Sequence, residues 1–180
     1  MLITYVLHVE DRPGVLNRVS SLLRRRDYNI DSLTVGHSDT PGVSRMTLVV
    51  DAQPAAAPRI EANLYKLAHV LRVENLTDVP SVDRTLALVK VATTLENRGQ
   101  VMQLGEVFRA RVVDVSTDSL ILEITGTDDK VDNLLDVLAP FGVMEMARTG
   151  ALAMSRGRKQ QLADLPQTHA AEDASISYSV

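Results

Sequence analysis

Residues suited to binding a small charged molecule gather in the segment from Glu10 to Leu16, between the first predicted strand and the first predicted helix. We expect the backbone N–H groups of Gly14, Val15 and Leu16 to lie at the helix N-terminus, where unpaired donors and the helix dipole bind anions. An α-amino acid has a carboxylate for those donors and an ammonium for a carboxylate such as Asp11. Asn29 begins the next predicted strand and is expected beside them, where its amide can donate or accept.

The same segment also has an ordinary structural interpretation. Gly14 permits a tight backbone turn that a Cβ would obstruct. An Asp-x-Pro-Gly sequence before a helix is common as a turn that also caps the helix. By itself this segment therefore favours a structural turn, and only a βαββαβ context leaves a ligand site and a structural turn equally open.

The other residues with catalytic or metal-binding chemistry lack the spacing that such sites need. His37-Ser38-Asp39 has the residue types of a catalytic triad, but adjacent residues in an extended segment cannot converge on one another. The histidines are scattered, and the absence of cysteine excludes thiolate metal sites and cysteine nucleophiles. No P-loop and no G-x-G-x-x-G motif occurs. We therefore predict no catalytic residues and no metal site in this chain.

The elements that would position the Glu10–Leu16 segment follow the order βαββαβ. Alternating apolar residues predict strands over 2–9, 29–36, 44–50 and 70–76. Helical spacing predicts two helices, and their apolar stripes are Val15, Leu16, Val19, Leu22 and Leu23, then Ile60, Leu64, Leu67 and Ala68. This order is typical of a ferredoxin-like fold, with two helices on one face of the sheet and the other face open.

The same order recurs in the second half of the chain. Strands are predicted over 85–92, 112–115, 120–125 and 143–147. The helical stripes are Val101, Leu104, Val107 and Phe108, then Val131, Leu134, Leu135 and Leu138, and Asp128-Asp129 is expected to cap the second helix. The fold class is therefore α+β, with ferredoxin-like units over 1–78 and 83–158 joined near 78–81. Residues 159–180 have a polar composition that predicts a disordered tail.

The composition of the chain argues against some classes of binding partner. A net charge of -4 and only 3% aromatic residues argue against nucleic-acid binding and against an anionic membrane surface. No apolar run approaches the ~20 residues that span a bilayer, and the N-terminus has no basic leader. We therefore expect a cytoplasmic protein without a membrane or nucleic-acid partner.

Several segments together resemble the small regulatory subunits of acetohydroxyacid synthase, also called acetolactate synthase, whose N-terminal unit is an ACT domain. In the first half these are residues 10–16, 24–36, 44–47, 64–67 and 70–73. In the second half they are residues 88–91, 108–110, 112–115, 147–150 and 155–157. ACT motifs alone occur in many amino-acid-regulated enzymes. The stretch from Tyr28 to Val35, with Ser44-Arg45-Met46-Thr47 and the matching second unit, is more specific, and the resemblance covers nearly all of residues 1–158.

The resemblance implies a non-catalytic subunit that activates a catalytic large subunit and confers feedback inhibition by valine or another branched-chain amino acid. The effector would bind at an ACT dimer interface, through Asp11, Gly14 and Asn29 with the backbone of Val15, Leu16 and Ile30 nearby. Several family members have asparagine where this chain has Asp11, so its valine affinity could differ. Thiamine diphosphate, FAD and Mg²⁺ are expected on the catalytic partner and none of them on this chain. The size of each unit agrees with a homodimer, because a unit of about 80 residues is marginal alone.

Two other classes of protein compete with this interpretation. An amino-acid-responsive transcription regulator would need a helix-turn-helix segment, and the acidic chain has none to spare. A small enzyme on a ferredoxin-like fold would need a titratable cluster, which the sequence does not show.

We predict that a chain ending at Lys159 folds and dimerises as the full-length chain does, because the residues beyond it contain no apolar stripe to bury. Thermal unfolding and sedimentation of the two lengths side by side test this. Precipitation of the shorter chain, or its failure to dimerise, would contradict the prediction.

Overall fold

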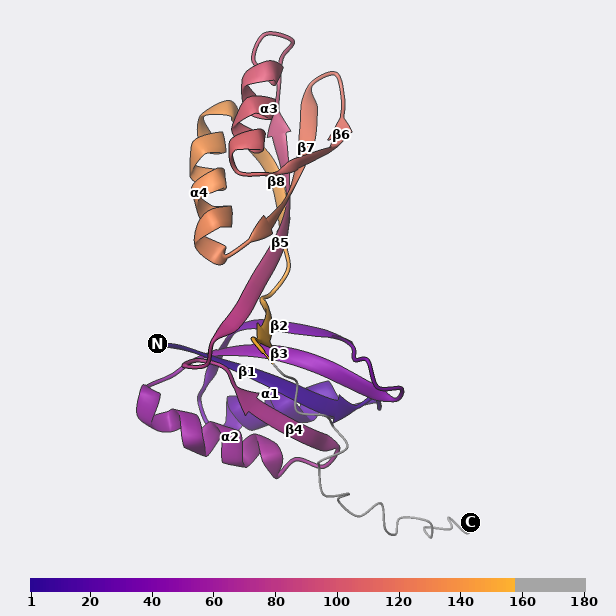
Figure 1. The fold of residues 1–180 in the computed structure, drawn as a ribbon, viewed down its shortest axis with the longest axis vertical. Coiled ribbons are helices and arrows are strands. Elements are labelled where there is room, and N and C mark those ends of the chain that lie inside the picture. The colour runs from indigo at the N-terminus through magenta and orange to yellow at the C-terminus, as the bar shows by residue number, and fades with distance from the viewer. Residues whose placement is uncertain (158–180) are drawn as a thin grey trace.

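The computed structural model describes residues 1–157, which form two βαββαβ units one above the other along the long axis (Figure 1). The predicted tail over 159–180 and residue 158 lie outside the described residues. No helix among residues 1–157 is long and apolar enough to cross a membrane.

The N-terminal unit is a four-stranded antiparallel sheet with two helices on one face. Its strands lie in the order β2-β3-β1-β4. Its elements are β1 (Leu2–Glu10), α1 (Val15–Arg25), β2 (Asn29–His37), β3 (Val43–Asp51), the 3-10 turn η1 (Pro54–Ala56), α2 (Ala57–Tyr65) and β4 (Val70–Asn75). The predicted ferredoxin-like order is confirmed, and β2 is an edge strand.

The C-terminal unit repeats this topology with the strand order β6-β7-β5-β8. Its elements are β5 (Ser81–Ala92), α3 (Arg98–Val107), β6 (Arg111–Val115), β7 (Ser119–Gly126), α4 (Asp128–Leu138), η2 (Ala139–Phe141), β8 (Val143–Arg148) and β9 (Leu152–Ser155). The α+β class with two tandem units is thus confirmed. The predicted junction lies between β4 and β5, although Ser81 is already part of β5.

Each unit has its own apolar core between sheet and helices. In β1 the alternate residues Ile3, Tyr5, Leu7 and Val9 are completely buried, as their spacing predicts. In the C-terminal unit the corresponding core residues are Ala87, Val89, Val91, Val101, Leu120, Leu122, Ile124, Val131, Leu134 and Leu138. The two cores are separate clusters, so each unit is stabilised mainly by its own packing.

Four details of the predicted helices are wrong. Leu16 is 44% exposed and Val107 is 77% exposed, because each points away from the buried stripe of its helix. Ala68 is exposed because α2 ends three residues before it, at Tyr65. The N-cap of α4 is Thr127, which leaves Asp128 and Asp129 in the first turn.

A two-stranded ribbon that the sequence did not predict covers part of the outer face of the N-terminal sheet. The first residues of β5 pair with β9, so that Ser81 lies opposite Ser155. Ala153 of this ribbon is buried against Val6 and Leu76. The expectation that this face stays open is therefore wrong where the ribbon lies.

Two leucines of α1 provide a matched test of this packing. We predict that Leu23→Ala lowers the free energy of unfolding by about 2–5 kcal/mol, because Leu23 is only 1% exposed and its removal leaves a cavity. Leu16→Ala, on the same helix but 44% exposed, should change it by about 0.5 kcal/mol or less. Urea unfolding followed by circular dichroism measures both, and equal losses would show that the two side chains are buried alike.

Candidate functional site

The turn between β1 and α1 is built around the backbone conformation of Gly14. This residue is the N-cap of α1 and has a φ of 83°, in the left-handed region that favours glycine. A Cβ placed on Gly14 would meet no atom within 4 Å. The expected obstruction of a Cβ is therefore wrong, and the conformation, not crowding, explains the glycine.

The N-terminus of α1 is open to an anion. No side chain caps it, and its first turn contains no acidic residue. The N–H of Val15 makes only a long hydrogen bond, 3.5 Å, to the carbonyl of Arg12. Val15 is buried and Leu16 is exposed, so the turn presents backbone donors beside one apolar side chain.

Asp11 lies beside the far end of β2. Its N–H donates to the carbonyl of Gly42 at 2.8 Å, in the turn between β2 and β3. Its carboxylate oxygen Oδ2 lies 3.8 Å from Nδ1 of His37, the last residue of β2. Both side chains are largely exposed, so this end of the edge strand presents a carboxylate to solvent next to the α1 N-terminus.

Asn29 and Ile30 lie at the opposite end of the same strand. Asn29 pairs with Asp51, which also pairs with Leu2 at the start of β1. Because β1 and β2 both run antiparallel to β3, they are parallel to each other, and Asn29 is about 25 Å from the turn at ~3.3 Å per residue. The expectation that Asn29 lies beside Asp11 and Gly14 is therefore wrong within one chain.

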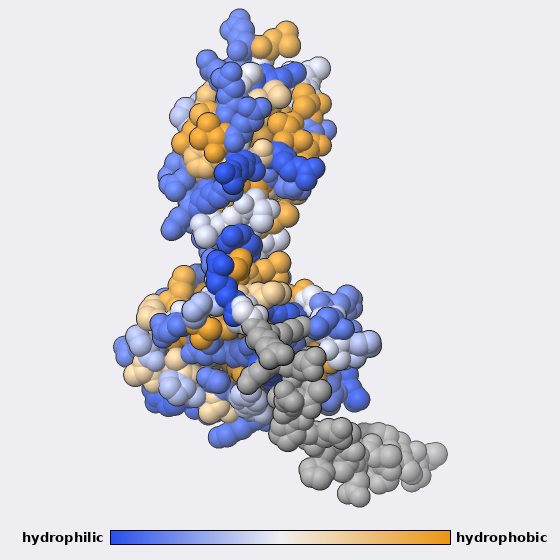
Figure 2. Space-filling view, viewed as in Figure 1, coloured by the Kyte–Doolittle hydropathy of each residue, from blue (hydrophilic) through white to orange (hydrophobic). Residues whose placement is uncertain are grey.

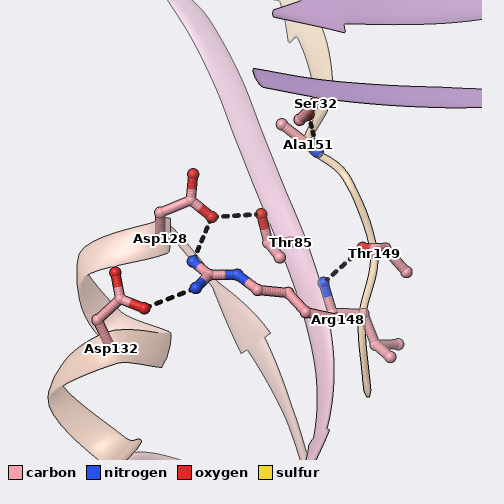
Figure 3. Close-up of polar contacts among 8 residues, drawn as sticks. Ser32, Thr85, Asp128, Asp132, Arg148, Thr149 and Ala151 are labelled. Atoms are coloured by element: carbon pink, nitrogen blue, oxygen red, sulfur yellow. Dashed lines mark hydrogen bonds and ion pairs between the residues drawn. The ribbon is translucent and has the colours of Figure 1, made fainter. Parts of the chain in front are cut away.

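A second polar site lies between the two units. It is a cleft of about 510 Å³, lined on one side by Asp31, Ser32 and Leu33 of β2. The other side is formed by Asp128, Asp132, Arg148, Thr149, Gly150 and Ala151. The N–H of Ala151 donates to the hydroxyl oxygen of Ser32 at 3.0 Å and joins the two sides (Figure 3).

Arg148 holds the first turn of α4 to the end of β8. Its guanidinium donates to Asp128 at 2.5 Å and to Asp132 at 2.6 Å (Figure 3). The hydroxyl of Thr85 also donates to Asp128, at 2.8 Å. Burial acts to raise the pKa of Asp128, but these hydrogen bonds and the charge of Arg148 outweigh it and lower that pKa. Asp128 is therefore ionised at neutral pH and tied to β5 and β8.

Sequence reasoning did not single out Ser32, Gly150 or Arg148 as site residues. Gly150 lies after the last predicted strand, and its close neighbours belong to the other unit, so no local pattern marks it. Arg148 is distant in the sequence from Asp128 and Asp132, and only the fold brings β8 and α4 close enough for these ion pairs. Among residues 1–157, no group of three or more histidine, aspartate or glutamate side chains is placed to hold a metal ion.

Family models match both units of the chain. Residues 6–72 match the model described as an AHAS small subunit-like ACT domain. Residues 84–157 match the model of the small subunit of acetolactate synthase. The two matched segments therefore correspond to the N-terminal unit and the C-terminal unit of the fold.

Relatives of similar length match across both units. The chain is 45% identical over 157 residues to a probable acetolactate synthase small subunit of Archaeoglobus fulgidus, covering 87% of this chain and 98% of the relative. It is 47% identical to the acetolactate synthase small subunit of Mycolicibacterium smegmatis, covering 83% and 88%. The crystal structure of the small subunit from Thermotoga maritima superposes with a TM-score of 0.81 at 38% identity, covering 88% of this chain and 99% of that one.

Proposed function

The chain belongs to the family of acetolactate synthase small subunits, and from this premise we propose that it is a feedback regulator responding to valine or another branched-chain amino acid. A small subunit of this synthase has a regulatory role and implies a catalytic large subunit as its partner. Beyond that role, we propose that this chain activates the large subunit and that the bound amino acid inhibits the complex.

The observation that supports this proposal best is the separation of the candidate residues along β2. Asp11 and Gly14 lie at one end of the edge strand, and Asn29 and Ile30 at the other. One chain therefore supplies two half-sites that cannot meet. A second copy is needed to complete each site, and β2 is available for that copy because it is the outermost strand of its sheet.

Antiparallel pairing of β2 with β2 of a second copy would bring the half-sites together. A two-fold axis near Leu33 sets Asn29 of one copy opposite His37 of the other, because the two lie four residues on either side of it. His37 lies beside Asp11. Two identical sites then form at the two ends of the paired strands, as an isologous interface requires.

The chemistry of such a site suits a branched-chain amino acid. The carboxylate would accept from the open N–H groups of α1 and the ammonium would donate to Asp11. The exposed side chain of Leu16 and the half-buried Ile30 supply apolar contacts for the ligand side chain. Selectivity for valine over alanine should be modest, because each buried carbon contributes only ~0.8 kcal/mol.

We further propose that the chain is not itself an enzyme and acts in the cytoplasm on a large subunit that carries thiamine diphosphate, FAD and Mg²⁺. The purified chain should show no acetolactate formation from pyruvate with these cofactors added, since residues 1–157 contain no group of three or more histidine, aspartate or glutamate side chains placed to hold the Mg²⁺ that this chemistry uses. A sensitive acetolactate assay measures this. Turnover that persists after removal of every trace of large subunit would contradict the proposal.

Mixed dimers test whether each effector site uses two chains. Gly14→Asp places a negative charge where the ligand carboxylate is expected, and loss of a charge-assisted hydrogen bond of ~1.5–3 kcal/mol weakens binding about 10- to 150-fold. Asn29→Ala removes the amide from the other half-site. Homodimers of either variant should therefore bind valine weakly, whereas a mixed dimer of the two variants should regain one intact site per dimer. Calorimetry with valine gives the affinity and the stoichiometry.

Gly157→Asp is the control for placing an aspartate at a glycine with a left-handed backbone conformation. Gly157 has a φ of 89° and open space around it, as Gly14 does, but it follows β9 and is not part of the turn between β1 and α1. This variant should bind valine as the parent protein does. Mixed dimers that bind no better than the two homodimers would contradict a site shared between chains, and a monomer in sedimentation at micromolar concentration would contradict the dimer itself.

A further inference from the structure

The two units meet at a narrow waist. Figure 2 shows hydrophilic and near-neutral residues over much of the visible surface there, with some hydrophobic residues among them. Two chain segments cross it, the middle of β5 and the return connection Thr149–Ala151 (Figure 1). The N–H of Thr149 donates to the carbonyl of Leu86 at 2.9 Å, which ties the two segments together. Units joined without a large apolar interface are expected to move relative to one another.

The return connection touches β2 so closely that only glycine fits at position 150. A Cβ on Gly150 would lie 2.6 Å from Oγ1 of Thr34, 3.0 Å from Oγ of Ser32 and 3.2 Å from the carbonyl carbon of Leu33. One of these atoms is backbone, and the two hydroxyls sit on short side chains, so the contact cannot relax without moving β2. Any shift of β2 would therefore move this connection as well.

A bulge in β2 separates this contact from the proposed effector residues. Ile30 pairs with Val50 and Ser32 pairs with Val49, so Asp31 is the extra residue. A β-bulge bends its strand locally and increases its twist. A ligand that holds Asn29 and Ile30 therefore acts on the strand two residues before Ser32, whose hydroxyl accepts from the N–H of Ala151.

On the other side of the waist, the connection is fixed to the C-terminal unit. Arg148 directly precedes Thr149 and is paired with two carboxylates of α4 (Figure 3). The hydroxyl of Thr149 accepts from the N–H of Leu86 at 3.1 Å. A displacement of Gly150 is thus passed to β8 and to the first turn of α4.

The hydroxyl of Thr34 shows that the present contact has an energetic cost. Its oxygen is buried and makes no hydrogen bond within residues 1–157. A buried polar atom without a partner is rare in folded proteins and destabilises the arrangement that contains it. An arrangement of β2 in which this hydroxyl found a partner would recover that loss of free energy, and a switch element requires two arrangements of similar free energy.

We infer that the Thr149–Ala151 connection, packed on Ser32 and Thr34 of β2, is the coupling element through which an effector bound at the start of β2 acts on the C-terminal unit. This inference rests on the proposed function for the identity of the effector. It assigns to Gly150 and Ser32 a role in transmission and none in ligand binding. The cleft beside them gives the two units room to move.

The test compares Gly150→Ala and Ser32→Ala with two controls that carry the same substitutions elsewhere, Gly99→Ala on α3 and Ser21→Ala on α1. A Cβ on Gly99 meets nothing within 4 Å. Each full-length protein is titrated with valine by calorimetry, and hydrogen exchange is measured at residues 148–155 with and without valine. Each is also reconstituted with the large subunit to measure valine inhibition.

In the parent protein and both controls, valine should bind, change exchange over 148–155 and inhibit the enzyme. In Gly150→Ala and Ser32→Ala, valine should bind as in the parent, but the exchange response should vanish and the coupling between binding and activity should fall by about 5-fold or more. Retained coupling in both variants would overturn the inference. Loss of valine binding would overturn it too, since the residues would then belong to the ligand site.

A measurement without ligand separates this inference from the proposed function. In Ser32→Ala the amide of Ala151 loses its acceptor, so its exchange should accelerate about 2- to 10-fold. In Gly150→Ala the amides of β2 should exchange faster than in Gly99→Ala. If the parent binds no branched-chain amino acid, the proposed function fails, and this arm still decides the coupling: unchanged exchange in β2 would overturn it.

Discussion

The antiparallel pairing of β3 with both β1 and β2 is the constraint on which the rest of the molecule depends. It makes β1 and β2 parallel, so that the turn after β1 and the start of β2 lie at opposite ends of the sheet. It also leaves β2 at the edge, where no other strand formed by residues 1–157 pairs with its outer side. A binding site that needs both ends of β2 therefore calls for a second chain, and that edge is where the chain can be met.

Glycine is required at positions 14 and 150 for two different physical reasons. Gly14 has open space around it and is explained by its left-handed conformation at the start of α1, where the first N–H groups of a helix have no partner within it. Gly150 has no such conformation and is explained by the atoms of β2 that surround it. Gly14 lies in the turn proposed as one half of the effector site, and Gly150 packs the connection between the units against β2.

The sequence predicts most of the fold because alternation and helical spacing report local burial, as the completely buried Tyr5 and Leu134 illustrate. It fails where burial depends on another unit. Ala153 is buried only because β9 lies on the N-terminal sheet, and four residues are too few for a periodic signal. The position of Asn29 is a different case, because the βαββαβ order itself implies that β1 and β2 are parallel. Because the two are close in the sequence, the start of β2 is expected beside the end of β1, whereas the topology places them at opposite ends of the sheet.

A site shared between two chains also links ligand binding to assembly. If only the dimer contains the complete site, the effector stabilises the dimer by mass action, and its apparent affinity rises with the concentration of the chain. The same ligand then acts on two equilibria, the pairing of β2 edges and the position of β2 against Gly150. Because Ser32 and Thr34 lie between the two proposed half-sites on one strand, any change in β2 on pairing would also shift the contact at the waist. Assembly and signalling in this small subunit are therefore expected to be one process, set by the geometry of a single edge strand.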